Sequence, residues 1–160
     1  MDRSSFGRKD RLIKEKRHDA YLKRLKLSEP TICSQCGAVF SNGRWTWKEE
    51  PQNAHKIICP ACQRHADHYP AGIIEISGQF YKDNKTEILN LIQNTEKLEK
   101  GERPLERLIS IKDSAGVTVI KTTGIHLARR IGEALSRAYK GDYSFNYADG
   151  EDYIQVFWRR

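Results

Sequence analysis

Four cysteines in two Cys-x-x-Cys pairs constrain this chain more than any other feature. They are Cys33, Cys36, Cys59 and Cys62, and the chain has no further cysteine. Each pair can form a tight turn that offers two thiolates to one cation, and two pairs complete a tetrahedral shell with metal–sulfur distances of about 2.3 Å. The spacing predicts one Zn²⁺ ion bound by all four cysteines, in a small zinc-ribbon-like module over residues 30–70.

Other uses of the four thiols fit the sequence less well. Two disulfides need an oxidising compartment, and the first residues, Met1 to Ser5, lead into charge and not into the apolar core of a secretion signal. We therefore expect a cytoplasmic protein. A dithiol redox centre would use one pair and leave the other unexplained. Tetrahedral sulfur accepts iron as well as zinc, but four thiolates close the shell, so we expect a structural metal and not a catalytic one.

Positive charge is concentrated in the first part of the chain. The net charge is +7; residues 1–70 carry 14 basic and 8 acidic side chains, and residues 71–160 carry 14 and 13. Residues 1–29 combine this charge with few apolar residues, which predicts a basic arm, helical or disordered, that binds phosphates. A solvated helix is the alternative. The candidate RNA-binding residues of the arm are Arg3, Arg8, Lys9, Arg11, Lys14, Lys16 and Arg17.

Two tryptophans lie between the cysteine pairs. Residues 44–48 alternate as in a strand, which places Trp45 and Trp47 on one face and basic residues on the other. The rings either cover the small core of the module or stack on bases beside the cations, and both interpretations stay open. The module adds four candidate RNA contacts to those of the arm: Arg44, Trp45, Trp47 and Arg64.

After residue 70 the pattern changes to alternating strands and helices. We expect strands over residues 73–81, 105–112, 117–121, 143–147 and 153–158, and helices over 85–100 and 124–139. This order predicts an α+β fold for residues 71–160, a ferredoxin-like (split βαβ) domain with both helices on one face of an antiparallel sheet. The open face is a candidate RNA surface, with ring-stacking candidates Phe80, Tyr81, Tyr143, Phe145, Tyr147 and Phe157.

Two sets of motifs together resemble a known family. The two cysteine knuckles are Cys33-Ser34-Gln35-Cys36-Gly37 and Cys59-Pro60-Ala61-Cys62, and an α/β segment with the helix 124–135 follows them. Together these motifs resemble the cysteine-rich N-terminal region of the large-ribosomal-subunit export adaptor family and its archaeal relatives. The sequence is also similar to small bacterial proteins with the same layout. The resemblance implies that the four cysteines bind metal and that the partner is the large subunit. The family's further Cys-x-x-Cys pairs are absent, so a second zinc is not implied, and a nuclear export role does not transfer.

The sequence therefore predicts a non-enzymatic, zinc-stabilised protein that binds RNA. The most specific form of this prediction is rRNA binding on the large ribosomal subunit, with contacts to ribosomal proteins as well. The chain has no P-loop, no paired carboxylates and no Ser/His/Asp grouping. No apolar run approaches the ~20 residues that cross a bilayer, so we expect no membrane partner. The alternative is a protein–protein adaptor or a small transcriptional regulator.

Overall fold

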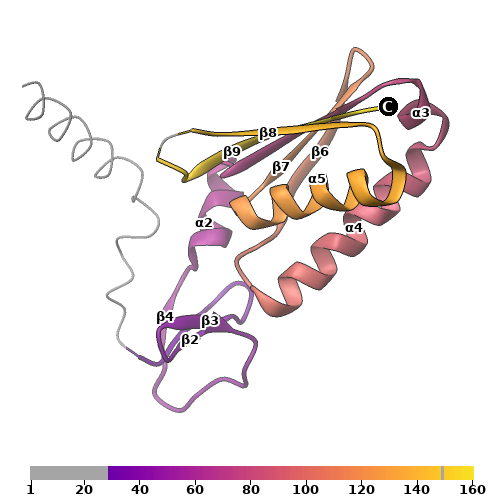
Figure 1. The fold of residues 1–160 in the computed structure, drawn as a ribbon. Helices are drawn as coiled ribbons and strands as arrows, with labels where there is room; N and C mark the ends of the chain where they lie inside the picture. Colours follow the sequence, from indigo (N-terminus) through magenta and orange to yellow (C-terminus); the bar gives the residue numbers. More distant parts are fainter. Residues whose placement is uncertain (1–28, 149) are drawn as a thin grey trace, which may run out of the picture.

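The computed structural model describes residues 29–148 and 150–160, which form a mixed α+β structure with two sheets (Figure 1). The predicted basic arm, apart from Glu29, lies outside these residues. The smaller sheet contains the short strands β1 (Thr31–Cys33), β2 (Val39–Ser41), β3 (Arg44–Thr46) and β4 (His55–Ile57), in the order β3-β2-β1-β4. We call residues 30–70 the metal module.

A helix that the sequence analysis did not predict follows the smaller sheet. This helix, α2 (Pro60–Asp67), begins inside the second Cys-x-x-Cys pair. Cys59 is its N-cap, and Pro60 occupies the first turn, where the missing N–H is not needed. The helix ends at His68, which adopts a left-handed conformation with φ of 51°. The second knuckle is therefore a loop that leads directly into a helix.

The larger sheet has the strand order β6-β7-β5-β9-β8. Its strands are β5 (Gly72–Ser77), β6 (Leu108–Ser114), β7 (Val117–Thr122), β8 (Asp142–Ala148) and β9 (Tyr153–Arg159). Helices α4 (Lys85–Glu102) and α5 (Ile125–Tyr139) cover one face of this sheet (Figure 1). Their buried side chains share one core with those of the strands. None of the helices in the described residues is long and apolar enough to span a membrane.

The first strand of this sheet is shorter than predicted. It ends at Ser77, and residues 79–81 belong to the short helix α3 (Gln79–Asp83). Gly78 makes the turn between them with φ of 110°, and a Cβ at this position would lie 2.2 Å from the carbonyl oxygen of Arg160. The turn directs the Tyr81 ring into the core, where its hydroxyl lies 2.6 Å from Thr118 Oγ1.

The sheet is mixed and not antiparallel as predicted. Strand β9 lies beside β5 and runs parallel to it, with Ile74 opposite Val156. Helix α5 leads into the edge strand β8, and the following hairpin returns β9 to an interior position. Burial explains this order, because β9 alternates fully buried residues with outward ones, whereas most of β8 is exposed. The predicted ferredoxin-like arrangement is not confirmed.

Most of the aromatic side chains proposed to stack on RNA serve the core instead. Tyr81 is buried in it, and Phe80, Tyr143 and Phe145 pack against it. The strand register explains this result, because Phe145 pairs with the buried Val156 and therefore faces the helices. Tyr81 therefore cannot form part of a stacking surface, and the other three rings are engaged by the core on at least one side.

Candidate metal centre

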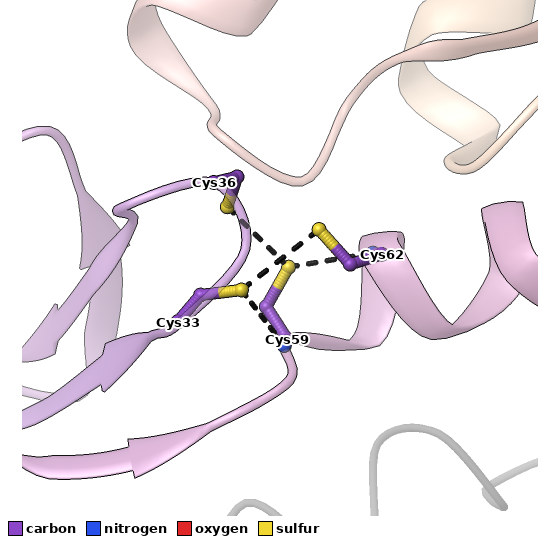
Figure 2. A group of neighbouring side chains, drawn as sticks. All are labelled: Cys33, Cys36, Cys59 and Cys62. Atoms are coloured by element: carbon purple, nitrogen blue, oxygen red, sulfur yellow. Dashed lines mark hydrogen bonds between the residues drawn. The ribbon is translucent and has the colours of Figure 1, made fainter.

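The four cysteines converge on one point between the small sheet and α2 (Figure 2). Their sulfur atoms all lie within 4.8 Å of one another. The Sγ atoms of Cys33 and Cys62 are 3.8 Å apart, as are those of Cys36 and Cys59. Four sulfurs placed 2.3 Å from a central ion are separated by about 3.8 Å, whereas a disulfide needs about 2.0 Å. The four cysteines are therefore free thiols that could hold one metal ion.

Backbone groups of both knuckles fix the sulfur positions. The N–H of Cys33 donates to the carbonyl oxygen of Ala38 at 2.8 Å, and that of Gly37 donates to Cys33 at 3.0 Å. Gly37 closes this turn with φ of 82°, a conformation that side chains disfavour. Backbone N–H groups also donate to sulfur, among them that of Cys59 to Cys33 Sγ at 3.2 Å and that of Cys62 to Cys59 Sγ at 3.4 Å. Such donors are typical of thiolate shells.

Arg107, from the segment before β6, completes the site. Its guanidinium donates to Cys36 Sγ at 3.0 Å and to Cys62 Sγ at 3.2 Å, and lies 3.7 Å from Cys59 Sγ. Its Nε donates to the carbonyl oxygen of Pro104 at 2.8 Å, which holds the planar group in place. Four thiolates around a divalent cation carry a net charge of −2, so the half-buried guanidinium beside them offsets half of that charge.

Trp47 lies on the same guanidinium and ties the module to α4. The Arg107 carbon Cζ lies 5.8 Å from the centre of the Trp47 ring. The Trp47 indole N–H donates to the carbonyl oxygen of Lys100 at 2.6 Å. Trp47 and Arg107 thus connect three parts of the chain: the segment just after β3, the end of α4 and the thiolate cluster. The metal centre and the contact between module and larger sheet share these side chains.

The thiols differ in acidity. Burial alone would raise the pKa of the Cys33 thiol. Hydrogen bonds from backbone N–H groups, of which that from Cys59 has the largest effect, outweigh burial and lower this pKa to about 7. Burial raises the pKa of Cys59 well above its usual range and also raises that of Cys62, where the Arg107 hydrogen bond opposes it. At neutral pH a metal ion must therefore displace protons from Cys59 and Cys62.

This difference predicts a pH-dependent metal affinity. The affinity should rise with pH, by at least about 100-fold per pH unit while Cys59 and Cys62 are protonated in the free protein. Isothermal titration calorimetry in two buffers of different ionisation enthalpy should count more than two released protons near pH 7, because Cys33, with a pKa of about 7, adds to the two from Cys59 and Cys62. A competition titration between about pH 6 and pH 8, corrected for the chelator's own protonation, checks the slope. An affinity that does not change with pH contradicts the assignment.

The four predicted RNA contacts of the module differ in how far they are exposed to solvent. Arg44 and Trp47 are exposed, Trp47 with 40% of its surface accessible. Trp45 is only 9% exposed and packs on Phe40, with 5.5 Å between ring centres. Arg64 is 8% exposed, lies over the Tyr69 ring at 5.6 Å and donates to its carbonyl oxygen. A base contact at Trp45 and a phosphate contact at Arg64 do not fit this burial. The predicted contacts of the arm lie outside the described residues.

Sequence reasoning missed Arg107, the residue most closely associated with the thiolates. It lies 45 positions after Cys62, in a segment read only as the start of a strand. Nothing local distinguishes it from the other basic residues, because its role depends on the packing of the module against α4. A search for an arginine near a cysteine pair would not have found it.

Comparisons with known proteins add no identification. No protein-family model, curated protein or solved structure matches the chain. The resemblance to the export adaptor family stays a prediction, and the assignment of the metal centre rests on the geometry of the thiols and of Arg107.

Proposed function

We propose that the protein is a non-enzymatic, RNA-binding protein stabilised by one structural Zn²⁺ ion. Cys33, Cys36, Cys59 and Cys62 would hold the ion, which would supply the cross-link that the small module needs. Four sulfur ligands leave no position for a substrate, and Arg107 occupies the space beside three of them. This closed shell is why we assign the metal to folding and not to chemistry.

The distribution of charge is the observation that carries RNA binding. Residues 1–28 contain ten basic and four acidic side chains, residues 29–70 contain four of each, and residues 71–160 contain 14 and 13. The net positive charge therefore lies almost entirely in the segment before the metal module. A polyanion partner explains such a concentration, since phosphate binding by Lys and Arg gains from counterion release. We propose the large ribosomal subunit as the partner, with the module and the α/β part presenting the arm.

Sedimentation with purified large ribosomal subunits tests this proposal. The protein should sediment with the subunits at low salt and be released as salt rises, because counterion release drives the binding. Replacing Arg8, Lys9, Arg11 and Lys14 by alanine should reduce the slope of log K against log salt by about 3.

A matched variant controls for loss of charge alone. Lys82, Lys97, Lys112 and Arg137 are exposed residues of the larger domain, and their replacement by alanine removes the same charge. This variant should keep most of the affinity. Equal losses for the two variants, or binding that does not respond to salt, would overturn the role of the arm.

A further inference from the structure

Strand β8 forms one edge of the larger sheet and presents unpaired backbone groups there (Figure 1). In the neighbouring strand β9, the N–H of Ile154 donates to the carbonyl oxygen of Ala71, so the even-numbered residues of β9 bond β5. The odd-numbered residues of β9 therefore bond β8, where their partners are the even-numbered residues. The N–H and C=O groups of Tyr143, Phe145 and Tyr147 consequently point away from the sheet, and nothing in the described part of the chain bonds them.

The side chains of β8 follow a pattern that is symmetric about Phe145. Aromatic residues alternate with short polar ones on both sides of it. Two copies of β8 paired antiparallel about Phe145 would place aromatic rings opposite one another on the face that the helices cover, and Ser144 opposite Asn146 on the other face. Asp142, the only charged residue of the strand, would lie opposite Ala148 and not opposite a second acid. This register therefore gives every residue of the strand a compatible partner.

Arg129 of α5 holds the aromatic row of β8 in place. Its guanidinium lies over the Phe145 ring, with Cζ 4.9 Å from the ring centre, and donates to the Tyr147 hydroxyl at 3.1 Å. The Phe145 ring centre also lies 5.8 Å from that of Tyr143 and 5.7 Å from that of Tyr147. Side chains that are already fixed lose less conformational entropy when a partner packs against them.

The opposite edge of the sheet lacks these features. Strand β6 has a shift in register between Leu108 and Ser110, and it carries Lys112 and Asp113. Bulges and charged side chains, lysine above all, hinder the pairing of an edge with a further strand. Strand β8 keeps a continuous register with β9 and contains no proline and no lysine. Of the two edges of this sheet, β8 is therefore the one suited to accept another strand.

We propose that two copies of the chain dimerise by antiparallel pairing of their β8 strands about a two-fold axis at Phe145. The two Phe145 residues exchange their N–H···O bonds, and Tyr143 of each copy does the same with Tyr147 of the other. The symmetry of the strand about Phe145 favours a second copy over an unrelated segment, because only a second copy reproduces the same side-chain matches on both sides of the axis. This inference is independent of RNA binding, because it uses neither the basic arm nor the metal module.

Analytical ultracentrifugation of the metal-loaded full chain, freed of nucleic acid, tests this inference. We expect a monomer–dimer equilibrium with a dissociation constant of about 10–100 μM, at about 0.3 M salt to screen the repulsion between two chains of charge +7. The double substitution S144K/N146K places like charges directly opposite one another in the dimer and should weaken it about tenfold or more. The control Q93K/N94K adds the same charge at exposed positions of α4 and should leave the equilibrium unchanged.

A complementary variant tests the register of the pairing. The S144E/N146E protein should dimerise poorly alone but pair with the S144K/N146K protein, because every charged pair across the interface then has opposite signs. A mixture of these two variants that stays monomeric would overturn the proposed pairing.

Amide hydrogen exchange locates the interface on the strand. At concentrations that populate the dimer, the amides of Tyr143, Phe145 and Tyr147 should be protected in the unmodified chain and unprotected in S144K/N146K. The amides of residues 144 and 146 bond β9 and should be protected in both proteins. A chain that is monomeric at millimolar concentration, or a dimer that S144K/N146K leaves intact, would contradict the assignment of β8.

Discussion

Replacing Cys59 by alanine, or removing the metal with a chelator, is expected to unfold the metal module and leave the larger α/β part folded. The reason lies in the composition of the two cores. Three of the seven buried residues in the module core are themselves cysteines, the others being Ala38, Phe40, Trp45 and Ala61. Without the ion this core is too small to offset the loss of chain entropy. The larger core contains thirteen buried residues and needs no metal.

The size of the effect should be large on the module and small elsewhere. Structural zinc sites bind with about 10–16 kcal/mol at neutral pH, which equals or exceeds the stability of an ordinary domain. Loss of that binding energy should abolish dispersed amide signals for residues 30–70. Signals of the larger core, and the Trp158 indole that is bound to Lys140, should stay in place.

A neighbouring substitution controls for disturbance of the knuckle. Gln35 lies between the first two ligands and is exposed, so Gln35→Ser should keep the metal and the folded module. Either of two results would contradict this account: a Cys59→Ala module that stays folded without metal, or a single transition in which the whole chain unfolds with metal loss.

Replacing Arg107 by alanine is expected to weaken metal binding by about 10–100-fold and to loosen the module from α4. The first effect follows because groups that donate to ligating atoms typically contribute this much to affinity. The second follows because the Trp47 ring loses the guanidinium on which it lies. Arg107→Lys should recover only part of the affinity, because an ammonium group cannot match the planar fork that reaches Cys36 and Cys62 together.

The measurements for Arg107 separate its two roles. Zinc affinity by chelator competition reports the effect on the ion, and the Trp47 indole signal reports the contact with Lys100. Arg137→Ala removes an exposed arginine of α5 and should change neither quantity. An Arg107→Ala protein with unchanged zinc affinity and an unchanged Trp47 signal would show that the guanidinium contributes neither to metal binding nor to the contact with α4.

Most of what could be predicted followed from the spacing of the cysteines and from the periodicity of apolar residues in the helices and strands. Two Cys-x-x-Cys pairs suffice to predict a cluster of four thiols, because the ligand set is local within each pair. Helix α5 also follows from sequence, since Leu127, Ile131 and Leu135 recur at helical spacing and are fully buried. The β8–β9 hairpin was predicted within about two residues of its observed strands, from alternating residues on each side of a turn.

What failed depends on contacts between distant residues. Either strand of the β8–β9 hairpin could pair with β5, and the local sequence pattern does not predict which of the two becomes the edge strand. The burial of Arg64 and of Trp45 depends on the neighbours that the fold supplies, Tyr69 and Phe40. Arg107 reaches the thiolates only because the module packs against the end of α4. None of these contacts leaves a periodic signal in the sequence.

X-ray absorption spectroscopy at the zinc edge, on protein purified without added metal, tests the central claim most directly. The account predicts one zinc per chain with four sulfur neighbours at about 2.3 Å and no nitrogen or oxygen ligand. An iron edge in place of zinc would change the metal but keep the four-thiolate shell. A shell that contains nitrogen or oxygen at about 2.0 Å, or a stoichiometry far below one, would contradict the closed structural site.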